Sequence, residues 1–499
     1  MTREQQDVEE VDVVVVGAGL SGIGAACHLR RDCPEQSVVV LEARTQLGGT
    51  WDLFRYPGVR SDSDMFTLGY ALRPWRSATA IARGADILAY LQDTARAYGV
   101  DRQIRTGHRA VRAEWSSERQ RWRLAVQRPD GETVLSCAFL WLCTGYYRYD
   151  HGHLPDLPGR EEFAGRLVHP QHWPADLDPA GARMVVIGSG ATAVTLVPAL
   201  AAQGAAVTMV QRSPSYLASV RADDPLVRRL SGRVPTRLLT GVVRARNVAV
   251  QTGVVALSRH RPETVRRALL RRVTRRLPVG YDVGTHFTPH YPPWDQRLCI
   301  VPDGDLFAAL RSGQVDVVTE AVQGLTVDGV RLASGRELPA DVVVTATGLE
   351  LLAFGGLRLA IDGREVDQGR TLAYKGLMLA GVPNLAFTVG YASASWTLRA
   401  DLVAGWVTRL LRRMRRRGLA VVTPEPPSDD VGPEPRRPLI GLNSGYVRRG
   451  AGRLPQQGTR RPWVLPQNHL VSVALLRLGR QTDGLRFARA DDGRPDRGG

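Results

Sequence analysis

Two glycine-rich loops in the sequence have the spacing that binds the phosphates of a nucleotide. Each loop follows a run of β-branched residues and precedes an apolar stretch. In such loops the first glycine permits a tight turn, the second lets backbone N–H groups approach the ligand, and the third position allows close helix packing. The exposed N–H groups and the helix dipole then attract an anion. The loop residues are Gly17, Gly19 and Gly22 in the first copy, and Gly188, Ser189, Gly190, Thr192 and Ala193 in the second.

The residues that end the strand after each loop distinguish the two sites. Glu42 stands at the first of these positions, where a carboxylate can accept hydrogen bonds from both ribose hydroxyls. The corresponding strand in the second copy ends in Gln211, Arg212 and Ser213 and has no acid. Guanidinium and hydroxyl groups bind a 2′-phosphate, which a carboxylate would repel. The sequence therefore predicts FAD at the first site and NADPH, in preference to NADH, at the second.

The hydrophobic pattern places both loops in βαβ units, which predicts an α/β fold with two Rossmann-like dinucleotide-binding domains and a helical insertion. The first unit has strands at 12–16 and 37–42, with a helix through 29 between them. The second unit begins at 184 and has its second strand at 206–211. The predicted domains are the FAD domain (1–147 and 350–499, including a C-terminal tail), the NADPH domain (148–214 and 294–349) and the insertion (215–293).

Several other elements are predicted from their patterns. We expect a helix at 86–98, a β-meander at 112–135, a separate buried strand at 139–143, and a last long helix from 395 past 417. The stretch 423–461 is rich in Pro, Arg and Gly and is expected to be loop, and the last ten residues are expected to fray.

Composition excludes several classes of protein. No apolar run reaches the roughly 20 residues of a membrane span, and no basic signal sequence precedes the first strand. The 5 cysteines contain no CxxC pair, so neither a disulfide framework nor a metal site is expected. These features predict a cytoplasmic protein.

The net charge of +17 comes from arginines that cluster at 266–277 and 409–417. A solvated helix face is the simplest interpretation of such runs. No nucleic-acid-binding module accompanies them, so no nucleic-acid partner is expected. Peripheral contact with an anionic membrane stays open as an alternative, because both runs can form amphipathic helices.

The segment after the first βαβ unit indicates how a flavin would be used. Positions 48–62, GGTWDLFRYPGVRSD, contain no cysteine, which argues against a disulfide reductase. Two long gapped motifs and a third short one instead resemble the type I Baeyer–Villiger flavin monooxygenases, and in particular their mycobacterial ethionamide-activating subgroup. The first motif comprises Gly48, Gly49, Thr50, Trp51, Tyr56, Pro57, Gly58 and Asp62; the second comprises Phe163, Gly165, His169, Trp173 and Pro174; the third is Ala346 to Gly348.

The resemblance implies a reaction and a set of site residues. Such enzymes use NADPH, FAD and O₂ to convert ketones to esters or lactones through a C4a-peroxyflavin, which an arginine keeps anionic. The resemblance assigns that role to Arg297, with Asp62 orienting it, and it places Gly49, Thr50 and Trp51 against the flavin. His169 is implied at the domain junction and not in catalysis. Oxygenation of sulfur or nitrogen in thioamides, sulfides or amines stays open, as do the substrate and the oligomeric state.

Overall fold

The first βαβ unit forms as predicted in the computed structural model, which describes residues 8–425 and 435–490. β1 (Glu9–Val16) pairs in parallel with β2 (Val38–Leu41), and α1 (Leu20–Asp32) connects them. The valines of β1 are buried because helices cover one face of the sheet and a β-layer covers the other. The strands of this sheet lie in the order β18 (Arg364–Glu365), β17 (Arg358–Ile361), β4 (Arg109–Ser116), β5 (Arg121–Arg128), β6 (Gly131–Leu142), β1, β2 and β3 (Ile104–Arg105), with β21 (Leu385–Phe387) beside β6.

The predicted meander and the predicted separate strand are wrong in one respect. β6 (Gly131–Leu142) is one strand of 12 residues, so the separate strand at 139–143 is its second half. Its first half pairs antiparallel with β5 (Arg121–Arg128), and its second half pairs in parallel with β1. The two pairings overlap at Leu135 to Cys137, which makes the strand continuous.

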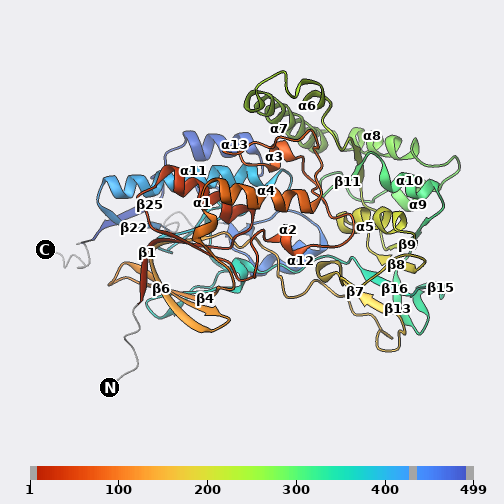
Figure 1. The fold of residues 1–499 in the computed structure, drawn as a ribbon, viewed down its shortest axis with the longest axis horizontal. Coiled ribbons are helices and arrows are strands. Elements are labelled where there is room, and N and C mark those ends of the chain that lie inside the picture. Colours follow the sequence, from red (N-terminus) through yellow and green to blue (C-terminus); the bar gives the residue numbers. More distant parts are fainter. Residues whose placement is uncertain (1–7, 426–434, 491–499) are drawn as a thin grey trace.

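The second βαβ unit builds a separate parallel sheet of the order β12-β9-β8-β16-β7. Figure 1 shows β1, β4 and β6 in one half of the molecule and β7, β8, β9 and β16 in the other. The fold class is therefore confirmed, whereas the domain limits stay a prediction. The strands and helices of this unit are β7 (Arg166–Val168), β8 (Arg183–Ile187), α5 (Ala191–Ala202), β9 (Ala206–Gln211), α10 (Asp305–Arg311), β12 (Val315–Thr319), β13 (Val322–Thr326), β14 (Gly329–Leu332), β15 (Glu337–Pro339) and β16 (Val342–Thr345).

The insertion is mainly helical, but it begins with a short strand. This strand, β10 (Leu217–Val220), pairs in parallel with β11 (Cys299–Pro302), which follows the insertion, so the two ends of the insertion lie close together. Between them lie α6 (Pro225–Leu230), α7 (Thr236–His260), α8 (Pro262–Thr274) and α9 (Val283–Phe287). α7 packs against α3 (Met65–Leu68) of the first half. Within the described ranges, no helix is both long enough and apolar enough to cross a bilayer.

The C-terminal part returns to the first sheet and then covers it. α11 (Trp396–Arg416) packs along α1, and it ends at Arg416 and not beyond Arg417 as predicted. The stretch predicted as loop contains a short helix, α12 (Gly445–Gly450), while residues 426–434 and most of the predicted frayed tail lie outside the described residues. The remaining elements are α2 (Thr50–Leu53), α4 (Gly84–Ala97), β3 (Ile104–Arg105), β4 (Arg109–Ser116), β17 (Arg358–Ile361), β18 (Arg364–Glu365), β19 (Ala373–Tyr374), β20 (Met378–Leu379), β21 (Leu385–Phe387), β22 (Leu419–Pro424), β23 (Arg437–Pro438), β24 (Gln456–Gln457), α13 (His469–Val473) and β25 (Leu485–Arg489).

Candidate functional site

A cavity of about 780 Å³ lies where the loops of the two βαβ units meet. It is lined by the first glycine loop, the first motif, the second glycine loop and the segment around Arg297. The structure thus brings together residues that are far apart in the sequence. The predicted site residues that line it are Gly17, Gly19, Glu42, Gly49, Thr50, Trp51, Asp62, Gly190, Thr192 and Arg297; those that do not are Gly22, Gly188, Ser189, Arg212 and Ser213.

The first glycine loop leaves a helix N-terminus open toward the cavity. α1 begins at Leu20, and its N-cap residue Gly19 has no side chain to bond the first free N–H groups. Gly17 has φ +100, and a Cβ there would lie 2.8 Å from the backbone oxygen of Cys143. A Cβ on Gly22 would lie 1.7 Å from the oxygen of Gly17, which explains why Gly22 packs the loop and does not line the cavity. The loop is thus shaped to present N–H groups to an anion.

Glu42 holds the first loop against the end of β2. Its Oε2 accepts a hydrogen bond from the N–H of Ala18 at 2.8 Å, and its Oε1 accepts one from the N–H of Arg44 at 2.9 Å. Burial raises the pKa of this carboxyl, while the two N–H donors oppose the rise. Each oxygen keeps a second acceptor position, so the side chain can still accept ribose hydroxyls from the cavity.

Replacing Glu42 with glutamine is expected to lower the affinity for FAD by about tenfold, because one backbone N–H loses its acceptor at a cost of about 1–3 kcal/mol. The ratio of flavin to protein absorbance after gel filtration measures the occupancy. Glu114→Gln is the matched control, since Glu114 also accepts a backbone N–H, from Gly363 at 3.1 Å, but does not line the cavity. Equal flavin occupancy in the two variants would argue against a role for Glu42 in binding FAD.

The second glycine loop has the same geometry but a different neighbour. α5 begins after Gly190, which again provides no side-chain cap, and the hydroxyl of Ser189 donates to the backbone oxygen of Ser213 at 2.9 Å. The amide of Gln211 is buried and turned away, donating to the oxygen of His286 at 2.7 Å. Arg212 is exposed, and its guanidinium has no partner among the residues that the structure describes. The end of β9 therefore offers a free cation and no acid.

Arg297 and Asp62 face the same cavity without touching. Both side chains are half-buried, and no direct ion pair joins them in the described parts of the chain. Nε of Arg297 instead donates to the backbone oxygen of Ala392 at 3.3 Å. Burial raises the pKa of Asp62, and the charges of Arg297 and Arg60 oppose that rise. Asp62 is thus electrostatically coupled to Arg297 but does not hold it by a contact.

Aromatic side chains that the sequence analysis did not identify surround Arg297. The rings of Tyr146 and Tyr147 lie 4.6 Å apart, and Tyr147 lies 6.4 Å from Tyr446 of α12. Burial acts against the charge of Arg297, but these three tyrosines and Asp62 hold its pKa above the ordinary value. The pair at 146–147 directly follows Thr144 and Gly145, just after the end of β6, and this position was a sequence signal for it. Tyr446 comes from the stretch predicted as loop and had no such signal.

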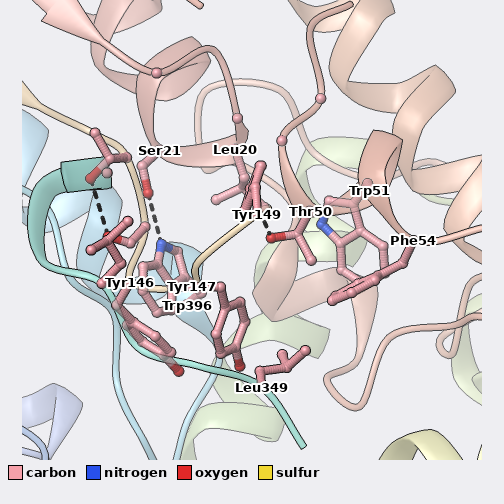
Figure 2. Close-up of a pocket in the computed structure, with 18 of the residues that line it drawn as sticks. Leu20, Ser21, Thr50, Trp51, Phe54, Tyr146, Tyr147, Tyr149, Leu349 and Trp396 are labelled. Carbon is pink, nitrogen blue, oxygen red and sulfur yellow. Dashed lines mark hydrogen bonds between the residues drawn. The ribbon is translucent and has the colours of Figure 1, made fainter. Parts of the chain in front are cut away.

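A second group of aromatic residues lines the cavity near the first glycine loop and the first motif. Figure 2 shows Trp51 and Phe54 facing the same pocket as Tyr147 and Trp396. The indole N–H of Trp396 donates to the hydroxyl of Ser21 at 2.7 Å, which ties α11 to α1. Flat rings around a large cavity suit a planar ring system such as isoalloxazine.

His169 contacts both chain segments that run between the two sheets, residues 143–165 and residues 346–357. Its Nδ1 accepts from the N–H of Gln171 at 3.2 Å, so Nε2 carries the proton and donates to the oxygen of Gly348 at 3.2 Å. Its ring packs on Gly152, where a Cβ would lie 1.9 Å from Cε1. Burial lowers the pKa of His169 and favours this neutral form. His169 lies at the crossing and does not line the cavity.

Replacing His169 with alanine is expected to reduce the free energy of unfolding by about 1–2 kcal/mol through the two lost hydrogen bonds. Because the folded-state pKa is lowered, the stabilisation by His169 is complete above its ordinary value of 6.5 and declines as the pH falls below it. Melting temperatures between about pH 5 and pH 7.5 test this dependence. His290→Ala, at an exposed position, is the control, and an unchanged acid sensitivity in His169→Ala would contradict the assignment.

The comparisons with known proteins agree with this geometry. The family profile described as pyridine nucleotide-disulphide oxidoreductase matches residues 11–261. The five cysteines are all buried and unpaired, so the match reflects the nucleotide-binding units and not a redox disulfide. The open structure of cyclohexanone monooxygenase superposes with a TM-score of 0.73 at 18% identity, covering 96% of this chain and 100% of that one. A steroid monooxygenase bound to NADP gives 0.75 at 21%, with coverage of 96% and 100%.

Sequence similarity is much higher to two mycobacterial proteins. The FAD-containing monooxygenase EthA of Mycobacterium tuberculosis is 52% identical over 96% of this chain and 98% of its own length. The putative FAD-containing monooxygenase MymA of the same organism is 48% identical, over 97% and 98%. The chain therefore belongs to the type I Baeyer–Villiger family of FAD-containing monooxygenases.

Proposed function

We propose that this chain uses NADPH and O₂ to convert ketones to esters or lactones. The observation that carries the proposal is the position of Arg297, a permanent cation in a large cavity beside the predicted flavin loop. A ketone is oxygenated when a negatively charged oxygen attacks its carbonyl carbon, so the site must favour negative charge on oxygen. Arginine suits this role because it keeps its proton at any physiological pH.

The residues around the cavity fit both cofactors. The N–H groups after Gly19 and the carboxylate of Glu42 would hold the pyrophosphate and ribose of FAD, with Trp51 beside its ring. The N–H groups after Gly190 and the guanidinium of Arg212 would hold NADPH. When bound and reduced, FAD supplies the activation of O₂.

Asp62 would help to keep Arg297 protonated. Its carboxyl group faces the same cavity as Arg297, and each group affects the pKa of the other without a contact. A guanidinium left free of an ion pair can turn its N–H groups toward the reacting oxygen. We therefore assign Arg297 as a catalytic residue and Asp62 as a residue that acts on Arg297 through the electrostatics of the cavity.

Oxygenation of sulfur or nitrogen is the alternative within the same family, and the product distinguishes the two. The test supplies purified, FAD-loaded protein with NADPH and, in separate reactions, aryl ketones, long-chain ketones, sulfides and thioamides. The proposal predicts an ester or lactone as the main product from at least one ketone. Products from sulfides or thioamides alone, with no ester from any ketone, would replace it with heteroatom oxygenation.

A further inference from the structure

The outer side of α7 exposes a row of apolar side chains that nothing in the described structure covers. Leu238, Val242, Val250, Val254 and Leu257 are exposed by 61%, 51%, 59%, 39% and 46%. The exposed small residues Gly241, Ala245, Ala249 and Gly253 lie between them at intervals of four residues, and the row extends about 28 Å along the helix. We call these five residues the α7 ridge. A soluble surface rarely exposes a continuous apolar strip of this length without a partner.

The surroundings of the α7 ridge are strongly basic. Glu263 is the only acid between 225 and 281, whereas the same stretch contains fourteen arginines. On α8 the exposed side chains of Arg271 and Arg272, and Arg275 just after it, have no partner among the described residues. In the other arginine cluster, at 409–417, Arg409 donates to the oxygen of Leu476 and Arg415 pairs with Glu35, and the cluster lies on α11 and not on the insertion. α8 packs directly against α7, so the unpaired charge of its arginines lies beside the α7 ridge.

We propose that the α7 ridge and the arginines of α8 form a docking surface for an anionic lipid membrane. An apolar strip beside basic side chains matches the apolar interior and the negative headgroups of such a membrane. A second copy of the chain fits poorly, because a symmetric contact through this surface would bring like charges together. Nucleic acid would use the arginines but leave the apolar strip without a function.

The position of α7 gives this surface a connection to the cavity. Nη1 of Arg244 donates to the backbone oxygen of Gly69 at 2.7 Å, and the amide of Asn247 donates to Asp64 at 2.9 Å. Asp64 lies two residues after Asp62, which lines the cavity. α6, α7 and α8 lie together along one edge of the molecule (Figure 1), so a membrane can approach them without contacting either sheet. In the docked protein, the segment that contains Asp62 and lines the cavity would lie directly behind α7.

Vesicle co-sedimentation of the full-length, FAD-loaded protein tests the proposal. The vesicles contain either phosphatidylcholine alone or an equal mixture of phosphatidylcholine and phosphatidylglycerol. We expect binding only to the anionic vesicles. Replacing Arg271, Arg272 and Arg275 with glutamine should lower the partition coefficient by roughly 100-fold, at about fivefold for each arginine. Replacing Leu238, Val250 and Val254 with glutamine should lower it by about tenfold at unchanged net charge.

Matched controls separate this surface from the total charge of the protein. Arg119, Arg123 and Arg364 are exposed on the first sheet, on or next to β5 and β18, and their replacement with glutamine changes the net charge equally. Val327 is a 53% exposed apolar residue elsewhere, and Val327→Gln controls for the loss of an apolar side chain. Flavin absorbance and melting temperature verify that each variant is folded. The proposal is overturned by absence of binding to anionic vesicles, by an equal effect of the control arginines, or by full binding of the variant in which Leu238, Val250 and Val254 are replaced. Turnover of ketones is not part of the readout, so the outcome is independent of the proposed reaction.

Discussion

Replacing Arg297 with alanine is expected to lower the rate of ketone oxygenation by about 10²–10³-fold, the usual cost of removing one charged donor from a developing oxyanion. FAD should remain bound, and its reduction by NADPH should continue, because Glu42, the first glycine loop and Arg212 are unchanged. The expected signature is therefore consumption of NADPH with hydrogen peroxide as the main product. Stopped-flow reduction of the flavin and quantification of the ester measure the two half-reactions separately.

Arg297→Lys is the matched variant for this prediction. Lysine keeps the positive charge but cannot present the planar fork of N–H groups or donate to the oxygen of Ala392 in the same way. We expect it to recover only part of the lost oxygenation rate. Ester formation at the wild-type rate in Arg297→Ala would show that Arg297 has no role in the reaction.

The second large effect concerns the choice of nicotinamide cofactor. Replacing Arg212 with glutamine is expected to reduce the preference for NADPH over NADH by about 10–100-fold, because a charge-assisted hydrogen bond to the 2′-phosphate is lost. The structure supports this expectation in two ways. Arg212 is exposed and unpaired among the described residues, and the neighbouring Gln211 is fixed to α9 and β12, so it cannot take over.

The ratio of kcat/KM for the two cofactors is the appropriate measurement. Arg212→Lys should retain most of the preference because it keeps the charge. The KM for NADH should change little in either variant, since NADH has no 2′-phosphate. If the glutamine variant kept the wild-type ratio, another cation would have to bind the phosphate, and the assignment of Arg212 would be wrong.

Local patterns predicted the parts of the fold that depend on short-range order. The two βαβ units begin and end within a few residues of their predicted limits because each glycine loop fixes the strand before it and the helix after it. β6 was divided wrongly because its continuity depends on two different partner strands, which no local pattern contains. β10 was missed for a related reason, since it pairs only with β11, on the far side of the insertion.

The candidate site residues were predicted from two kinds of information, local sequence patterns and the family resemblance. Glu42 and Arg212 follow from their positions at strand ends, and the structure places them there. Arg297 was identified only through the family resemblance, because its segment has no distinguishing pattern of its own. Tyr446 reaches the cavity because Asn443 bonds to the backbone and the carboxylate of Asp295, a contact between distant segments. Such long-range contacts could not have been predicted from one sequence.

The central claim is that the enzyme inserts one atom of O₂ beside a ketone carbonyl, and product analysis under ¹⁸O₂ tests it most directly. The FAD-loaded protein is supplied with NADPH, ¹⁸O₂ and, in separate reactions, aryl ketones, long-chain ketones, a sulfide and an amine. The account predicts an ester or lactone that carries one labelled oxygen in its ring or chain and an unlabelled carbonyl oxygen. An ester without label, or labelled sulfoxide and amine oxide products with no ester from any ketone, would contradict it.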